Sequence, residues 1–258
     1  YSLTNNIESD RYDPNDLGIL QAPNEVVTTA AISYNQLTPT AKFNSFSYSF
    51  NVRHEMLYKP FRFANTRFNA RGFWFFKNFW DMSVNISLNP WWQNDFFDLR
   101  TPGRFLKKVP WGFIGFEGSS DSRKKLFGRW GVGLAESVDI KADAFYFLRG
   151  GIRYRFSDRF SLDVNLNRTH DNGQFGFAFE RESNGDPIIG RRKNTDFTTL
   201  INGIYNFTPR MNLTLRARHY WSRVRYVSFF NVKEDGFWTD RTFINNKDQN
   251  VNIWNLDM

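Results

Sequence analysis

Apolar and polar residues alternate with a period of two along most of this chain. In residues 45–56, even positions such as Phe46 and Phe50 are apolar, whereas odd positions such as Ser45 and Asn51 are polar. The same alternation recurs in residues 79–89, 159–169 and 212–221. Successive side chains of a β-strand point to opposite faces, so the pattern predicts strands with one apolar and one polar face. Helical periodicity is almost absent, and we expect an all-β fold.

The length of these segments and the composition favour strands that cross a membrane. The segments run for about 10–14 residues, as tilted membrane strands do, whereas strands of soluble proteins cluster nearer 5–6 residues. Aromatic residues make up 19% of the chain, yet the mean hydropathy is −0.56 because Asn, Ser, Thr and Arg separate them. An apolar outer side with aromatic bands and a polar inner side is typical of membrane β-barrels. A soluble β-sandwich or a lipid-binding barrel is the alternative.

Turn signals predict how the strands are connected. Short polar turns are expected at Thr38–Thr40, Lys77–Asn78, Ser120–Ser122, Ser157–Asp158 and Thr208–Arg210. Longer irregular segments are expected at residues 90–108, 137–143, 169–196 and 227–250. Short turns on one side and long loops on the other are typical of outer-membrane barrels, whose short turns are periplasmic. We therefore predict an antiparallel transmembrane β-barrel of about 11–12 strands, an incomplete copy of a larger barrel with an even strand number.

Two regions are expected along the chain. Residues 1–23 are polar and are predicted to form a loop or linker, and residues 24–258 are predicted to form an outer-membrane β-barrel domain. The chain opens at Tyr1 and stops at Met258 inside a strand-like run, so we expect the domain to be truncated at both ends. No run of 18 apolar residues is present, so no transmembrane helix is predicted. The predicted location is the outer membrane of a Gram-negative bacterium.

Three groups of residues are candidates for function. The arginines predicted to face the lumen are Arg53, Arg67, Arg71, Arg149, Arg153, Arg155, Arg216 and Arg218. The aromatic residues predicted to form girdles at the membrane surfaces are Trp74, Phe76, Trp80, Tyr220 and Trp221. Trp91 and Trp92 lie in a predicted loop, where they are candidates for stacking on a sugar.

The net charge of +8 limits the choice of partners. A basic lumen, or an outer rim that faces anionic lipopolysaccharide, accounts for this surplus. The Lys and Arg residues are scattered among strand-like segments and form no helix or arm, so nucleic acid is not an expected partner. Outer-membrane lipid and lipopolysaccharide are the expected partners, with other outer-membrane proteins and glycans as further candidates.

No catalytic or metal-binding pattern is found in the sequence. The chain has three His and no Cys, which excludes thiol chemistry and leaves no metal-ligand spacing. We expect no enzyme and no cofactor. If the chain were a glycan hydrolase, Asp95, Asp98 and Glu117 would be the candidate carboxylates, because glycoside hydrolysis needs a pair of them.

Several segments carry a resemblance to a known family. They are residues 15–20 (NDLGIL), 120–126 (SDSRKKL), 201–209 (INGIYNFTP), 213–222 (LTLRARHYWS) and 250–257 (NVNIWNLD). They resemble the C-terminal β-barrel domain of the outer-membrane domain-of-unknown-function 5916 family. In that family a family-9-like carbohydrate-binding domain often precedes the barrel. This chain departs from the full pattern because it lacks that domain and the last strand with its terminal aromatic residue.

The resemblance implies fold and location more strongly than activity. Some members are labelled hydrolases, but no residues here support that activity. We expect a barrel that acts in transport, docking or scaffolding at the cell surface, beside carbohydrate uptake machinery. A glycan-processing hydrolase and a sugar-binding β protein are the alternatives.

Overall fold

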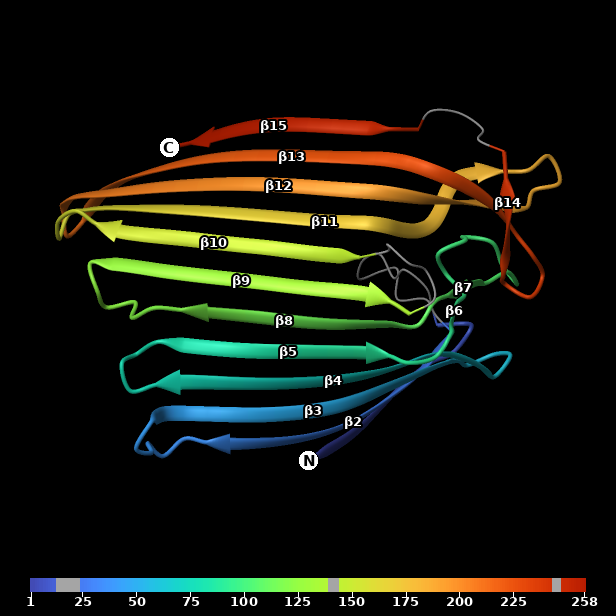
Figure 1. Ribbon diagram of the computed structural model, residues 1–258, viewed down its shortest axis with the longest axis horizontal. Coiled ribbons are helices and arrows are strands. Elements are labelled where there is room, and N and C mark those ends of the chain that lie inside the picture. The colour runs from blue at the N-terminus through green and yellow to red at the C-terminus, as the bar shows by residue number, and fades with distance from the viewer. Residues whose placement is uncertain (13–23, 139–143, 243–246) are drawn as a thin grey trace.

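Antiparallel strands form the computed structural model of this protein, which describes residues 1–12, 24–138, 144–242 and 247–258 (Figure 1). Within these residues, no helix is long and apolar enough to cross a membrane. The strands of the main sheet are β1 (Ser2–Glu8), β2 (Glu25–Gln36), β3 (Phe43–Leu57), β4 (Arg62–Phe76), β5 (Asp81–Asn89), β8 (Trp111–Ser119), β9 (Leu126–Ser137), β10 (Phe145–Arg155), β11 (Phe160–Arg181), β12 (Pro187–Thr208), β13 (Met211–Val232), β14 (Trp238–Arg241) and β15 (Gln249–Asp257). A separate two-stranded hairpin consists of β6 (Gln93–Asp95) and β7 (Leu106–Lys108).

The main sheet follows chain order from β1 to β13, apart from the β6–β7 hairpin. Each strand pairs antiparallel with the next. Both β14 and β15 pair with β13, at Phe229–Val232 and Arg216–Val224 respectively. Among the described strands, β1 and β15 do not pair with each other, so the sheet is not closed into a barrel. The all-β antiparallel prediction is confirmed, and closure is not observed.

Three details of the sequence prediction are wrong. Residues 1–23 were expected to form a loop or linker, but Ser2–Glu8 form the edge strand β1, while residues 13–23 lie outside the described part. Within the described ranges, the main sheet already has 13 strands instead of 11–12. Residues 169–196 and 227–250 were expected to be irregular, but β11, β12 and β13 extend to 22 residues each and occupy much of them. Beyond Leu166 on β11 and Phe197 on β12 the outward positions become polar, for example at His170, Lys193 and Arg225, which hides the alternation.

The two ends of the sheet differ as expected. All five predicted short turns connect β2–β3, β4–β5, β8–β9, β10–β11 and β12–β13 at one end, on the left in Figure 1. In the β10–β11 turn, the Ser157 hydroxyl accepts hydrogen bonds from the backbone N–H groups of Arg159 and Phe160. The opposite end carries β6, β7 and β14, and we call it the loop end (Figure 1).

The register assigns each strand residue to one of two faces. One face is apolar, and we call it the outer face: a straight row across it contains Phe50, Ala70, Ile86, Ile114 and Leu134. Large apolar side chains on this face stay exposed, with Leu148 at 49% and Ile152 at 57%. No second layer of the described chain covers them. Exposure of such a wide apolar surface marks a face that contacts lipid or another molecule.

The opposite, inner face is polar and hydrogen-bonded across strands. Asn69 bridges β3 and β5, because its amide donates to Asn51 and its oxygen accepts from Ser87. Farther along the sheet, Arg129 on β9 donates to Asp163 at 2.5 Å and to Asn165 on β11. Such bonds satisfy polar groups between neighbouring strands and keep the inner face ordered.

The buried apolar residues gather at the loop end. One cluster contains Leu99, Leu106, Ile189 and Val232, and a second contains Ala178, Ile188, Tyr226 and Phe229. Both clusters lie where connecting segments pack against the extended ends of β11–β13. The middle of the sheet is therefore a single layer, and the conventional core stabilises only its loop end.

Gly133 on the inner face provides a test of this packing. A Cβ atom there would lie 2.2 Å from the ring of Phe147 and 2.9 Å from that of Phe113. We expect Gly133→Ala to lower the free energy of unfolding by about 1–3 kcal/mol, because both rings must shift. Gly150→Ala is the matched control, since no atom lies within 4 Å of its Cβ position. Equal unfolding midpoints in denaturant for the two variants would contradict the assigned packing.

Candidate functional site at the loop end and inner face

The segment between β5 and β8, residues 90–110, folds over the inner face, and we call it the mouth loop. Its Asn94 amide donates to the carbonyl of Phe63 on β4 at 2.8 Å. On its other side, the Arg181 guanidinium on β11 donates to the hydroxyl of Thr101 and the carbonyl of Arg100. Because β4 and β11 are separated by β5, β8, β9 and β10, the mouth loop bridges distant parts of a curved sheet.

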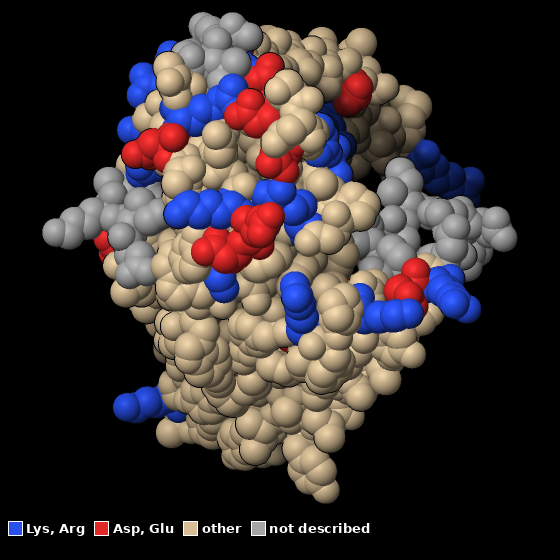
Figure 2. Space-filling model, turned by 90° about the vertical axis from the view of Figure 1, so that its right-hand side faces the viewer, with Lys and Arg blue, Asp and Glu red and all other residues tan. Residues whose placement is uncertain are grey.

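Further contacts attach the mouth loop to β11–β14. Arg104 forms an ion pair with Asp186 and donates to the carbonyl of Val232 at 2.6 Å. Leu99 and Leu106 are fully buried against the loop-end cluster. Figure 2 shows this end of the molecule, with basic and acidic side chains interleaved across its middle and upper part.

A three-residue ion cluster lies within the mouth loop. The Lys108 ammonium lies 2.7 Å from Asp95 and 3.0 Å from Asp98. Burial raises the pKa of Asp95, but Lys108 and the backbone N–H groups of Asp98 and Phe97 outweigh it, so that pKa lies below its ordinary value of 3.8. Burial lowers the pKa of Lys108, but the two carboxylates raise it above its ordinary value of 10.5. Asp95 and Lys108 are therefore both charged at neutral pH.

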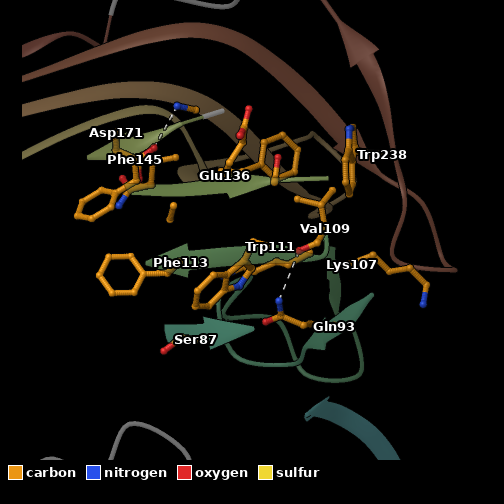
Figure 3. A pocket seen from close by; sticks show the side chains of 16 residues that line it. Ser87, Gln93, Lys107, Val109, Trp111, Phe113, Glu136, Phe145, Asp171 and Trp238 are labelled. Atoms are coloured by element: carbon orange, nitrogen blue, oxygen red, sulfur yellow. Dashed lines mark hydrogen bonds between the residues drawn. The ribbon is translucent and has the colours of Figure 1, made fainter. Parts of the chain in front are cut away.

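A cavity of about 410 Å³ opens between the mouth loop and the inner face. Figure 3 shows the rings of Trp111, Phe113 and Trp238 around the same space as the polar side chains of Gln93 and Asp171. The Gln93 amide donates to the carbonyl of Val109, and Asp171 accepts the backbone N–H of Gly173. Apolar rings with a few polar groups are typical of small-molecule sites. The sequence reasoning missed this cavity because its residues come from seven separate segments.

The eight arginines predicted to face the lumen all lie on the inner face by register. Their side chains make different contacts on this face. Arg149 pairs with Glu117 at 2.9 Å. Arg153 and Arg155 donate to the carbonyl of Ser122, which attaches them to the β8–β9 turn.

The remaining predicted arginines lie along the rest of this face. Arg53 forms an ion pair with Glu55, and the Arg67 guanidinium lies 5.4 Å from the ring centre of Trp111. Arg71 contributes to a second hollow of the inner face. Arg216 and Arg218 are exposed near the β15 edge.

Four of the five predicted girdle residues belong to the outer face. Trp74 and Phe76 lie near the short-turn end, where Trp74 donates to the hydroxyl of Tyr48 at 3.1 Å and Phe76 packs on Phe43. Trp80 is exposed in the β4–β5 turn and adjoins outer-face residues.

The neighbouring residues Tyr220 and Trp221 on β13 lie on opposite faces of the sheet. Trp221 lies on the outer face, in register with Phe197 on β12. Tyr220 was expected in the same girdle, and this assignment is wrong. Adjacent strand residues point to opposite faces, so Tyr220 faces inward, where its hydroxyl donates to Asp196 at 3.1 Å.

The two candidate sugar-stacking residues do not form a joint platform. Trp92 packs against Phe237 and Trp238, with ring centres 5.2 and 6.1 Å apart. Trp91 is 53% exposed and lies against Phe68 of the outer face. Trp92 therefore helps to fix the β13–β14 connection, and only Trp91 presents an accessible ring.

The candidate hydrolase carboxylates belong to two separate ionic groups. Asp95 and Asp98 share Lys108, whereas Glu117 pairs with Arg149. A general acid needs a raised pKa, and the pKa of Asp95 is lowered. In the described residues, no three His, Asp or Glu side chains are grouped so that they could hold a metal ion.

These features define a class of protein: an open antiparallel β-sheet with an apolar outer face, a polar inner face and a loop folded over one end. The family model for the domain of unknown function 5916 matches residues 1–258. The chain therefore belongs to this family, as the sequence motifs predict. No curated protein and no solved structure shows significant similarity to it.

Removing the shared cation should loosen the mouth loop. We expect Lys108→Gln to lower the free energy of unfolding by about 1–3 kcal/mol, because two partly buried carboxylates lose their counter-charge. Faster proteolysis within residues 90–110 should accompany this loss. Lys124→Gln in the exposed β8–β9 turn is the control and should change neither quantity. Wild-type protease resistance of the Lys108→Gln variant would contradict the role of this cluster.

The same ion cluster predicts a pH dependence. Because the pKa of Asp95 is lowered by folding, its stabilisation is present above pH 3.8 and is lost as the pH falls through the folded value. Lys108 has a raised pKa, so its stabilisation is present below pH 10.5 and is lost as the pH rises through the folded value. The stability difference between wild type and Lys108→Gln should therefore be constant near neutrality and shrink in strong acid. Unfolding curves recorded across this range test it, and an undiminished difference in acid would refute it.

Proposed function

We propose that this chain is the membrane-spanning part of an outer-membrane β-domain of a Gram-negative bacterium. The observation that carries the proposal is the uncovered apolar outer face on strands whose other face is polar. A bilayer stabilises the outer face, and water or ordered polar side chains occupy the inner one. In water, the same surface would favour aggregation.

The distribution of aromatic residues along the strands supports this arrangement. On β11, four outward apolar residues from Phe160 to Leu166 precede the outward Arg168, a stretch of roughly 20 Å at 3.3 Å per residue. The apolar band of outer-membrane barrels is about 25 Å tall, so this stretch accounts for much of it. Rings flank the stretch on both sides: Phe160 pairs with Tyr205 at the short-turn end, and Phe197 pairs with Trp221 on the side toward the loop end.

A bilayer also requires that the two edges of the sheet be paired. The edge strands β1 and β15 carry backbone groups that need hydrogen-bond partners, and hydrocarbon supplies none. We propose that further strands add to β1 and β15 and close the barrel. The mouth loop then lies at the outer opening of the barrel, because short turns are periplasmic and long loops face the cell exterior.

Among transport, docking and scaffolding, the geometry favours a solute path that the mouth loop narrows. The inner face presents solvated charges such as Arg149, whose side chain is 53% exposed. The cavity under the mouth loop combines the rings of Trp111 and Phe113 with Gln93 and Asp171, which suits a sugar-sized solute. A hydrolase is disfavoured because Lys108 neutralises the candidate carboxylates Asp95 and Asp98.

The absence of cysteine allows a direct test of membrane topology. Single cysteines at Leu166→Cys and Asn167→Cys place a thiol on the outer and inner face of the same strand. In outer-membrane vesicles, a small hydrophilic maleimide should label Asn167→Cys at least about tenfold faster than Leu166→Cys, because lipid excludes the reagent from the outer face. Both should react equally after denaturation. Equal labelling in the native membrane, or recovery of the protein in the soluble fraction, would refute the proposal.

A further inference from the structure

Four basic side chains lie close together on the outer face at the loop end, and we call them the outer cationic patch. Its members are Arg168 on β11, Lys193 on β12, and Arg223 and Arg225 on β13. Arg168, Arg223 and Arg225 are exposed and Lys193 is half-buried. The sequence analysis assigned functional arginines to the inner face and did not single out these four.

The register determines the position of the patch. Arg168 is in register with Phe197, and Phe197 with Trp221, so the first cation adjoins the aromatic residues at the end of the apolar band. Lys193 lies directly opposite Arg225. The remaining member, Arg223, lies opposite Thr195, the neighbour of His170 in the next strand.

The register also places these side chains close together. His170 lies one outward position after Arg168 on β11, and its partner Thr195 lies one outward position from Lys193 on β12. The Arg168 guanidinium also lies 5.9 Å from the ring centre of Tyr146, an outer-face residue of β10. The patch therefore extends along one continuous surface from β11 to β13.

The four cations lack acidic partners in the part of the chain that the structure describes. The ion pairs found there involve other basic residues, such as Arg129, Arg149 and Lys247. Asp171 on β11 and Asp196 on β12 face inward, where Asp196 accepts from Tyr220 and Asp171 from Gly173. Asp248, before β15, accepts the backbone N–H of Tyr226. Neighbouring like charges repel one another, so this surface is complementary to an anion that the chain does not supply.

The depth of the patch identifies the anion. Rings such as Trp221 lie at the level of lipid headgroups. Arg168 is in register with these rings, and the other three cations lie one or two outward positions beyond them on β12 and β13. On the loop side, this level corresponds to the headgroups of the outer leaflet. Arginine binds phosphate through two parallel N–H donors, and Lys adds a point charge.

We infer that the outer cationic patch binds the phosphate groups of a phosphorylated glycolipid of the outer leaflet, the lipid A part of lipopolysaccharide. The inference rests on the proposed membrane location and adds a defined lipid site to it. The occupant is a lipid and not free phosphate, because the cations continue directly from an apolar, ring-bordered surface that acyl chains would cover. One face thus supplies both the apolar and the ionic contacts of one amphipathic molecule.

The test compares two sets of variants of the full-length protein in nanodiscs. In the first, Arg168, Lys193, Arg223 and Arg225 are all changed to Gln. In the matched control, Arg216→Gln and Arg218→Gln remove exposed inner-face cations from β13, the strand that carries Arg223 and Arg225. The probes are bisphosphorylated lipid A, dephosphorylated lipid A and inorganic phosphate. Bound lipid is measured by native mass spectrometry after release from the nanodisc.

We expect retention of bisphosphorylated lipid A to fall on the order of tenfold or more in the four-site variant, since each cation near an anionic surface contributes to binding. The control variant should retain it as wild type does, and wild type should retain little dephosphorylated lipid. Equal retention by the four-site variant and wild type would overturn the inference. Equal retention of dephosphorylated lipid, or displacement of lipid A by millimolar phosphate, would also overturn it.

Failure of this inference can be told apart from failure of the membrane proposal. Thiol labelling of Leu166→Cys and Asn167→Cys reports insertion independently of lipid phosphate. A protein that inserts with the expected labelling but retains no phosphorylated lipid contradicts only the lipid site. A protein that does not insert contradicts both.

Discussion

In the part of the chain that the structure describes, the outer face of the main sheet has no covering layer, and the rest of the structure depends on this. Burial of apolar surface is the main driving force of folding, yet Leu148 and Ile152 keep about half of their surface exposed. The sheet must therefore obtain its order from other contacts. Cross-strand hydrogen bonds, such as those of Asn69 and Arg129, connect the inner face, and under the proposed function lipid stabilises the outer one.

The mouth loop links this single layer to the conventional core. Its Leu99 and Leu106 join the buried cluster at the loop end, while Asn94 reaches β4 on the other side. The Lys108 cluster keeps the β6–β7 hairpin compact between these attachments. The mouth loop thereby holds distant strands of the sheet together and lines one side of the aromatic cavity, so changes in the loop would alter both.

Much of the sheet could be predicted because alternate residues of a strand point to opposite faces, so the sequence shows which residues share a face. The inner arginines and the outer Trp74 and Trp221 follow from that rule, and the five short turns follow from polar turn residues between the strands. It fails where neighbouring contacts decide: Tyr220 follows the parity of its strand, but its position beside Trp221 suggested a shared girdle. The cavity and the Lys108 cluster depend on how the mouth loop folds back, and local sequence carries no signal for such long-range contacts. The outer cations were readable in principle, since Arg168 continues the outward series of Leu162, Val164 and Leu166.

The register has a geometric consequence. A line drawn straight across the paired outer residues begins at Ile32 on β2 and passes through Ile114 and Leu134 before it reaches His170 and Arg223. The line starts among apolar side chains and ends among charged ones, although every step is perpendicular to the strands. The apolar zone must therefore run diagonally over the sheet. If that zone is parallel to a membrane plane, the strands are tilted, as they must be in any barrel with a sheared register.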